Sequence, residues 1–525
     1  MLRVSVLVLV VYGGLLYLTG WSFNRMPMGF IPNQDQGYLF VAFQLPDSAS
    51  LERTKAVMER AAKTIREVPG VGHVIRICGM SFILGANGSH VGTMFVTLDP
   101  FDERLAPERS ADAIVQELRR RLSKIEDGLV FVFGAPPIRG LGSTGGFRVM
   151  IEDRGNNGPD TLQAETDNVI QLGNQTPGLT GLSTVFRANT PQLFVDVDRT
   201  KCKTMSVPLS QVFEALQVYL GGFYVNDFNQ FGRTWQVNVQ ADTPFRMQPE
   251  DMRRLQVRNA RGEMVPLGTL ASIEDDSGPF VIVRYNMYPA AAINGAALPG
   301  VSSGEAIRMV ENLARQQLPA SMAFEWTELA YLQIIAGSTT GFVFTGAVVL
   351  VFLVLAGQYE SWSLPLAVIF VVPMCILFSI AGVALSKLDV NIFTQIGFVV
   401  LVGLASKNAI LIVEFAKAKR ESGMPRYDAT LAACKLRLRP IMMTSFAFIL
   451  GVVPLVVSRG AGAEMRRTLG IAVFSGMLGV TLFGIFLTPM FYYVIQWFGD
   501  LRQGRRAAAA PPPSGEVSEA SPDWP

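Results

Sequence analysis

The chain consists mainly of long apolar stretches and one long amphipathic region. Six stretches are apolar over about 20 residues or more, which is the length that a helix needs to cross the hydrocarbon core of a bilayer. They cover residues 4–23, 337–357, 363–385, 391–416, 440–458 and 469–497. The first resembles a cleaved leader, but its apolar run is long for one and no small-residue cleavage motif precedes residue 24. We therefore predict six transmembrane helices, one before the amphipathic region and five after it.

The amphipathic region, residues 38–331, shows two hydrophobic periods in a regular order. A period of two predicts strands, and apolar positions three or four residues apart predict helices. In the first part, strands are expected at 38–45, 71–78, 90–98 and 129–133, and helices at 49–67 and 107–125. The resulting order, β-α-β-β-α-β, is that of the split βαβ motif.

The same pattern recurs later in the region. Strands are expected at 146–152, 182–186, 279–294 and 323–328, and helices at 160–172 and 302–317, with a long insertion between the two halves. The fold class is therefore an α+β membrane protein with six transmembrane helices, two split-βαβ subdomains and an inserted subdomain. The expected boundaries are 1–24 for the first transmembrane helix, 37–141 for the first subdomain, 142–187 with 277–330 for the second, 188–276 for the insertion, 336–498 for five transmembrane helices and 499–525 for a tail.

Basic residues between the apolar stretches indicate the orientation in the membrane. The loop from Lys417 to Arg439 contains seven Lys or Arg residues, and Arg502, Arg505 and Arg506 follow the last stretch. Loops rich in Lys and Arg stay in the cytoplasm, so both are expected inside and the amphipathic region outside. The last residues, 507–525, are rich in Ala, Pro and Ser, which predicts a disordered cytoplasmic tail.

Composition narrows the class of protein further. The 525 residues are 50% hydrophobic and 17% charged, with a mean hydropathy of +0.31, whereas soluble domains carry about 25% charged residues. The net charge of +2 predicts no nucleic-acid partner. Four dispersed cysteines and only two histidines provide neither metal-ligand spacing nor a nucleophile with its base. We therefore expect a transporter or receptor rather than an enzyme, with no metal and no cofactor.

Lys407 is the only ionisable residue close to the centre of an expected span. The span 391–416 has its midpoint near residue 404, about 4.5 Å of helix away. Burying an ammonium at this depth costs at least about 2.5–3.5 kcal/mol, so it usually marks function or a partner carboxylate. The alternative is a lysine that extends to the inner surface, but that distance, about 13 Å of helix, exceeds its length. Glu414, near the inner boundary, is expected to be solvated.

Five short segments carry recognisable motifs in a fixed order along the chain. They read FIPNQDQG at 30–37, GGFYVNDF at 221–228, YESWS at 359–363, GLASKNAILIVEF at 403–415 and RLRPIMMTS at 437–445. Together they resemble the resistance–nodulation–division (RND) efflux pumps, most closely the hydrophobe/amphiphile multidrug branch. The match covers nearly the whole chain but only the C-terminal half of such a pump.

The resemblance implies that the pump is driven by protons. Lys407, Arg437 and Thr444 would form its proton relay, with protons as the coupling ion. Arg437 and Thr444 share a helix face if Pro440 does not bend the helix strongly. From the residues alone, Arg437 could equally anchor the helix at the inner surface, Thr444 could bond its own backbone, and Asn408 has a minor role. The family's Gly-x-x-x-Asp-Asp motif is absent, so the resemblance implies an N-terminal half that carries the acidic pair, whether this chain is a fragment or a separate half.

The resemblance also assigns the soluble parts. The two split-βαβ subdomains would be periplasmic porter subdomains, and the insertion would be a docking subdomain. Cargo would contact Met80, Phe82, Phe95, Phe131 and Phe133, although phenylalanines on strands are more often core. Met80 stands where the family often has phenylalanine. The docking loop would consist of Gly221, Gly222, Tyr224, Asn226 and Asp227.

The expected function is proton-motive-force-driven efflux of hydrophobic or amphiphilic compounds across the Gram-negative envelope. The chain would lie in the bacterial inner membrane, as part of a homotrimer with a periplasmic adaptor protein and an outer-membrane channel. A metal- or lipid-exporting relative is one alternative, although His is nearly absent and the 21 Met are scattered. An outward-facing sensor or receptor is another, although only a loop and a tail are expected inside.

Overall fold

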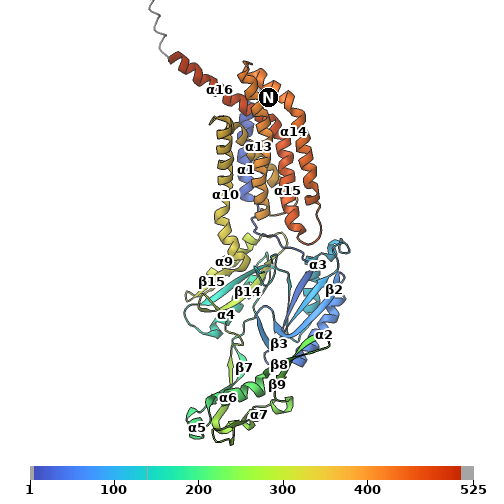
Figure 1. Cartoon of the computed structure of the whole chain (residues 1–525), viewed down its shortest axis with the longest axis vertical. Coiled ribbons are helices and arrows are strands. Elements are labelled where there is room, and N and C mark those ends of the chain that lie inside the picture. The colour runs from blue at the N-terminus through green and yellow to red at the C-terminus, as the bar shows by residue number, and fades with distance from the viewer. Residues whose placement is uncertain (1–4, 139, 510–525) are drawn as a thin grey trace, which may run out of the picture.

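The computed structural model describes residues 5–138 and 140–509. A bundle of long helices forms one end of the molecule, and units that contain β-strands form the remainder (Figure 1). Two of these units lie next to the bundle, and a third lies at the far end. The helices α1 (Ser5–Arg25) and α16 (Ile485–Ala509) both reach the free end of the bundle.

Six stretches of the described helices are long and apolar enough to cross a membrane, as predicted. They lie in α1, α10 (Glu328–Tyr359), α11 (Leu364–Ile369) with α12 (Val372–Leu385), α13 (Ile392–Glu421), α14 (Arg426–Val456), and α15 (Ala463–Gly479) with η5 (Val480–Gly484) and α16. Two helices begin well before the expected spans, α10 at Glu328 and α14 at Arg426. The helix α14 continues through Pro440, because neighbouring helices can compensate for the backbone hydrogen bond that a proline removes.

Three of these spans are well covered and three are not. The spans in α12, α13 and α15–α16 are 56%, 56% and 50% buried, whereas those in α1, α10 and α14 are 11%, 6% and 22% buried. Small residues allow the covered helices to approach closely, as where Gly397 of α13 meets Ala472 of α15. Lipid or further protein must cover the remaining apolar surface.

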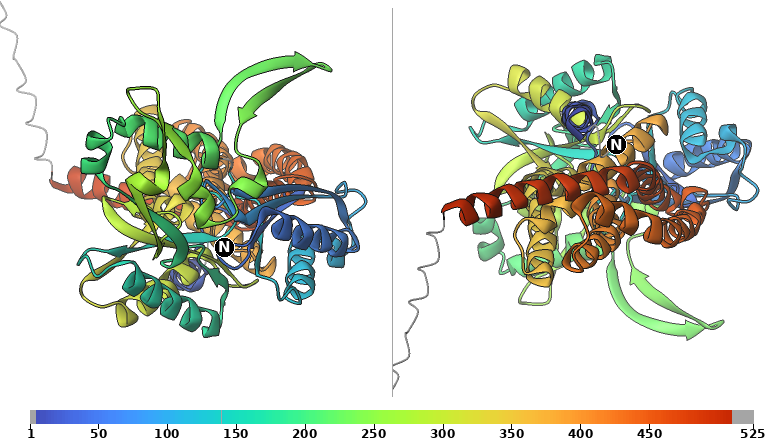
Figure 2. Two further views of the ribbon diagram at one scale, coloured as in Figure 1. Left: turned by 90° about the horizontal axis from the view of Figure 1, so that it is seen from below. Right: turned by 90° about the horizontal axis from the view of Figure 1, so that it is seen from above.

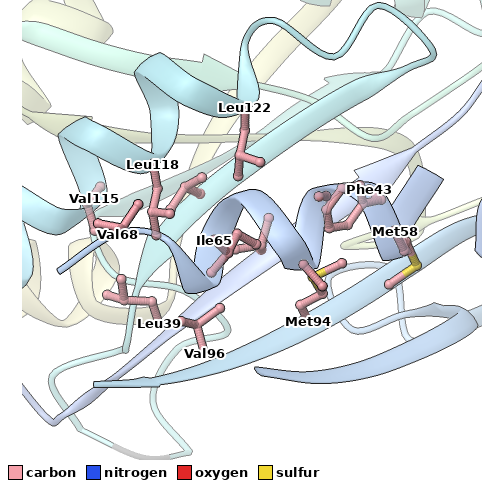
Figure 3. Close-up of a cluster of buried hydrophobic side chains, with 14 of the residues drawn as sticks. Leu39, Phe43, Met58, Ile65, Val68, Met94, Val96, Val115, Leu118 and Leu122 are labelled. Atoms are coloured by element: carbon pink, nitrogen blue, oxygen red, sulfur yellow. The ribbon is translucent and has the colours of Figure 1, made fainter. Parts of the chain in front are cut away.

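The first soluble unit contains a four-stranded antiparallel sheet with the strand order β2-β3-β1-β4. Its elements are β1 (Tyr38–Gln44), α2 (Leu51–Arg66), β2 (Val71–Ser81), β3 (Ala86–Leu98), η2 (Pro107–Arg109), α3 (Ala111–Leu122) and β4 (Leu129–Gly134). Leu39 and Phe43 of β1 point toward the helices, where Ile65 and Leu118 complete a fully buried core (Figure 3). Alternation along the strands therefore leaves the even-numbered residues of β1 on the opposite face.

The second soluble unit contains the sheet β13-β14-β5-β15, with β6 also paired to β14. Its elements are β5 (Phe147–Asp153), α4 (Pro159–Gln175), β6 (Leu179–Ser183), β13 (Arg284–Tyr285), β14 (Tyr288–Ala297), α9 (Ser303–Gln317) and β15 (Met322–Thr327). The strand expected at 182–186 lies three residues earlier, as β6, and after it the Thr184 side chain accepts a hydrogen bond from Phe186 N. The strand expected at 279–294 is divided by a turn in which Asn286 and Met287 have positive φ.

The inserted unit is attached through two neighbouring strands, β7 (Thr190–Val197) and β12 (Ala271–Gly278). It comprises α5 (Arg199–Thr204), α6 (Leu209–Leu216), η3 (Gln217–Gly221), β8 (Phe223–Gln230), β9 (Arg233–Val239), η4 (Thr243–Phe245), α7 (Pro249–Arg254), β10 (Gln256–Arg258), β11 (Met264–Pro266) and α8 (Leu267–Leu270). The strands β8 and β9 form a hairpin that projects away from the other elements (Figure 2). Every residue of both strands is exposed.

The tail that was expected to be disordered from residue 499 is helical as far as Ala509. In this part α16 runs across the end of the bundle (Figure 2). The Asp500 carboxylate accepts a hydrogen bond from Arg420 at 3.0 Å and another from Arg426 at 3.4 Å. These two contacts attach α16 to α13 and to the start of α14. The rest of the expected tail, residues 510–525, lies outside the described residues.

Candidate functional site

The candidate relay begins with α13, the helix that carries Lys407. The side-chain oxygen of Asn391 accepts hydrogen bonds from Phe393 N at 3.0 Å and Thr394 N at 3.2 Å. These bonds satisfy two amides that a helix start leaves without a partner. The cap therefore fixes where α13 begins and how Lys407 is presented.

Lys407 lies on the uncovered face of α13. Ile396, Val400 and Gly403 are exposed on the same face, at spacings of three and four residues. Ala405 lies on another face and is fully buried. Within the described part of the chain, no hydrogen bond or ion pair involves the Lys407 ammonium. The described bundle therefore brings no carboxylate into contact with the Lys407 ammonium.

Asn408 points toward α14 and not toward the Lys407 face. Its Nδ2 donates a 3.0 Å hydrogen bond to Ser445 Oγ, and both side chains are buried. The sequence assigned Asn408 only a minor role, and it did not identify this pair. The available signal was that both are polar residues in apolar spans, where such side chains commonly bond to a neighbouring helix.

Arg437 and Thr444 lie on α14, and neither forms a hydrogen bond or ion pair with Lys407 among the described residues. Thr444 Oγ1 donates to the carbonyl of Ile441 at 3.1 Å, which is the backbone bond considered as its alternative role. The Arg437 guanidinium lies 3.4 Å from the ring centroid of Phe415 on α13, and its buried Nε has no hydrogen-bond partner. The three expected relay residues are therefore on adjacent helices but are not connected within this chain.

An aromatic cluster covers the face of the first sheet that the helices leave free. Phe40 lies directly opposite Phe95 on β3 and Phe133 on β4. The ring centroids of Phe40 and Phe95 are 5.0 Å apart, and those of Phe131 and Phe133 are 6.3 Å apart. Three of the expected cargo residues thus share one face, as their even or odd spacing along paired strands requires. Phe40 completes the cluster and was missed by the sequence.

The two other expected cargo residues lie at the edge of this cluster. Phe82 stacks on Phe40 with centroids 5.4 Å apart and an interplanar angle of 10°. Phe82 is 42% exposed and Met80 is 37% exposed, whereas Phe133 is 6% exposed. The strand β2 extends to Ser81, so Met80 lies on a strand, opposite Asn87. The cluster therefore has an accessible edge and a buried centre.

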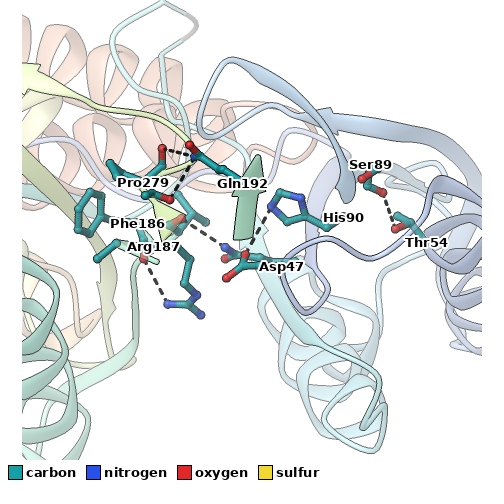
Figure 4. A network of polar contacts seen from close by, with 12 residues as sticks. Asp47, Thr54, Ser89, His90, Phe186, Arg187, Gln192 and Pro279 are labelled. Atoms are coloured by element: carbon teal, nitrogen blue, oxygen red, sulfur yellow. Dashed lines mark hydrogen bonds and ion pairs between the residues drawn. The ribbon is translucent and has the colours of Figure 1, made fainter. Parts of the chain in front are cut away.

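His90 lies where the first soluble unit meets the second (Figure 4). Its Nε2 is 3.7 Å from the Asp47 carboxylate, and its ring packs edge-on against Phe280 with centroids 4.8 Å apart. Burial lowers the pKa of His90, and the charge of Asp47 partly opposes this effect. A cavity of about 390 Å³ beside Asp47 is also lined by Asp160, Asp167 and Arg187.

The expected docking loop is a β-hairpin rather than a loop. Gly221 ends η3, and Gly222 then adopts a φ of 87°, which favours glycine. Tyr224, Asn226 and Asp227 follow on β8, where all three are exposed. The hairpin makes backbone pairs only between its own strands in the described structure, which leaves both its faces accessible.

Comparisons with known proteins decide the family. The family model described as AcrB/AcrD/AcrF matches residues 1–496. The chain belongs to this family. It is 38% identical to the multidrug/solvent efflux pump membrane transporter MepB of Pseudomonas putida over 477 residues, which cover 90% of this chain and 45% of that protein. It is 39% identical to the multidrug export protein AcrF of Escherichia coli K12 over 478 residues, covering 90% and 46%.

A third relative, multidrug resistance protein MdtF of Escherichia coli K12, is 36% identical over 498 residues, or 94% of this chain and 47% of that protein. The chain thus spans about half the length of these members of the AcrB/AcrD/AcrF family. The resemblance to RND multidrug efflux pumps is confirmed, and six apolar helices agree with a multi-pass membrane protein.

Proposed function

We propose that this chain is the C-terminal half of a proton-driven RND pump that exports hydrophobic or amphiphilic compounds. The observation that carries the proposal is the position of Lys407 in a member of this family. It is a cation near the middle of an apolar helix, on a face that the described bundle leaves uncovered. A partner half that supplies carboxylates to this face would satisfy the charge. Protonation of those carboxylates would then release Lys407 and change which helix contacts are favourable.

The aromatic cluster supports the proposed cargo class. Rings bind apolar compounds without directional hydrogen bonds, which suits a pump with broad selectivity. Phe82 and Met80 provide the accessible edge, and Phe95, Phe131 and Phe133 provide the deeper surface. The matched relatives carry names that include multidrug and solvent efflux.

The assembly is also part of the proposal. The exposed β8–β9 hairpin would contact a second copy in a homotrimer, and the inserted unit would face an outer-membrane channel together with a periplasmic adaptor protein. The soluble units would then lie in the periplasm and the bundle in the inner membrane. The basic residues in the last part of α13 and the first part of α14 agree with a cytoplasmic position for the connection between them, on the opposite side.

Dye efflux from energised cells tests the proposal. The chain should insert alone but export nothing, and it should export dye when it is produced with its N-terminal half, until a protonophore removes the gradient. Lys407→Ala should abolish export at an unchanged membrane level, and Lys407→Arg should restore only part of it because a guanidinium is larger and keeps its charge. Lys419→Ala, near the end of the same helix, is the matched control and should export normally. Gradient-driven export by the isolated chain, or normal export by Lys407→Ala, would refute the mechanism.

A further inference from the structure

The segment that follows α1 forms backbone hydrogen bonds with the start of α13. Met28 forms a parallel bridge with Val390. Gly29 N donates to the Val390 carbonyl at 3.3 Å, and Val390 N donates to the Pro27 carbonyl at 2.9 Å. Ile392 N, the first residue of α13, donates to the Phe30 carbonyl at 3.0 Å. Residues 27–30 thus bind like a short strand to the turn that begins the Lys407 helix.

The same segment is bound on its other side to the start of α9. Gly304 N donates to the Met28 carbonyl at 3.2 Å, and Phe30 N donates to Ser303 Oγ at 3.2 Å. The helix α9 packs on the sheet of the second soluble unit. Residues 27–30 therefore lie between a membrane helix and a soluble unit, with hydrogen bonds to both.

Two glycines make this close approach possible. A Cβ on Gly304 would lie 2.6 Å from the Met28 carbonyl oxygen, and a Cβ on Gly29 would overlap the Asp389 carboxylate. Neither glycine has a positive φ, so its backbone conformation does not require glycine. Close contact between neighbouring segments is thus the reason for glycine at both positions.

Both attachment points are capped helix starts. Asn391 caps α13, and its Nδ2 also donates to Asp389 at 3.0 Å. In α9, Ser302 and Glu305 form a reciprocal capping box. A displacement of α13 along its axis would therefore act on residues 390–392, which the hydrogen bonds of residues 27–30 connect to the start of α9.

We propose that residues 27–30 are the mechanical link through which a shift of the Lys407 helix reaches the second soluble unit, with Ser303 as a positioning residue. The proposal deepens the proposed function and rests on it, since it concerns coupling in that pump. The physical basis is a contiguous series of hydrogen bonds between two capped helix starts, and direct bonding is better evidence of coupling than proximity alone.

Two adjacent serines provide a matched test. Ser303→Ala removes the hydrogen bond from Phe30 N and leaves the α9 cap intact. Ser302→Ala removes the cap of the same helix and leaves the bond to residues 27–30. The variants are compared in the assembled pump in detergent, each with Lys407 and with Lys407→Ala. Hydrogen exchange of the peptide covering residues 298–310 is measured, together with the maximal efflux rate in cells.

With native serines, Lys407→Ala should change the exchange rate of this peptide by about threefold or more, because opening of α9 responds to the state of α13. The change should become smaller in Ser303→Ala, where only the bond from Gly304 N to the Met28 carbonyl still joins the two segments, and it should persist in full in Ser302→Ala. Ser303→Ala should also lower the maximal efflux rate by about threefold to tenfold without altering dye binding, the effect of losing one hydrogen bond. A response to Lys407→Ala that is missing with native serines, or that is as large in Ser303→Ala as with native serines, would overturn the link. An intact response without gradient-driven efflux would support the link and refute the proposed function.

Discussion

Asn408 on α13 and Ser445 on α14 are joined by a buried hydrogen bond of 3.0 Å, one residue from a lysine that faces away from both. The neighbouring residues Lys407 and Asn408 of α13 therefore face different surroundings. Asn408 joins two helices of this chain, whereas Lys407 is presented to whatever covers the free face. The two positions should respond differently to mutation.

Asn408→Ala should lower the stability of the protein in detergent by about 0.5–1.5 kcal/mol, since it leaves the Ser445 hydroxyl without its partner. A double-mutant cycle with Ser445→Ala, read by thermal unfolding, measures the coupling directly. Lys407→Ala serves as the control and should leave the unfolding temperature nearly unchanged. Additive effects of Asn408→Ala and Ser445→Ala would show that the bond contributes nothing.

Phe131→Ala should weaken binding of an apolar dye by about tenfold, because about 1–3 kcal/mol of apolar contact is lost. Phe131 is only partly buried, so the amount of protein in the membrane should stay unchanged. Phe133→Ala should weaken binding as well, but it should also cost about 3 kcal/mol of stability since this ring is buried. Phe43→Ala, on the opposite face of the sheet, should destabilise the protein without altering the dye affinity of the folded fraction. Unchanged affinity in both Phe131→Ala and Phe133→Ala would remove the aromatic cluster from the cargo site.

Acidification should destabilise the contact at His90. Burial lowers the pKa of His90 below its ordinary value of 6.5. As the pH falls below 6.5, the unfolded chain takes up a proton that the folded form resists, so stability is lost on going down in pH and is fully present above 6.5. The unfolding temperature of the solubilised protein should therefore fall less between pH 7.5 and 5.5 in His90→Gln than in the native protein. His73→Gln is the control and should keep the native pH response; equal responses of all three proteins would contradict the prediction.

A cysteine at Asn226 should form cross-links between subunits, because this residue is exposed on a hairpin that extends beyond its own unit. Gel electrophoresis of membranes treated with a short bifunctional thiol reagent would show dimers and trimers. Lys203→Cys on α5, exposed in the same inserted unit, should give far fewer. Only intramolecular products from Asn226→Cys would exclude the proposed contact.

The elements of the first soluble unit could be predicted because one face of each is covered by a single core. Alternation in β1 places Leu39, Val41 and Phe43 on the helix side, and the observed strand ends within a residue of the expected one. The family resemblance suggested Phe95, Phe131 and Phe133, and the observed strand pairing places all three on one side of the sheet. The strand expected at 182–186 was displaced by three residues from β6, because the hydrophobic period alone does not define where a short strand begins and ends.

Contacts between segments far apart in the chain could not be predicted from the sequence. Nothing in the period or composition of residues 27–30 indicates that they lie between Val390 and Ser303. The Asn408–Ser445 pair and the attachment of Asp500 to Arg420 and Arg426 were missed for the same reason. In each case the deciding interaction is made by residues whose local preferences are satisfied by several arrangements.

The pairing of β5 with β14 also fixes an order of events during synthesis. Val149 is bonded in register to Ile293, and the whole inserted unit lies between them in the chain. During translation, β5 cannot pair with β14 until residues 288–297 have been synthesised. By then all strands of the inserted unit have already been synthesised. The inserted unit can therefore fold before the second sheet, which is completed only after β14 has been synthesised. The last strand of this sheet, β15, ends at Thr327, and the helix α10 begins at the next residue. No linker therefore separates the strand that completes the sheet from the helix that follows it.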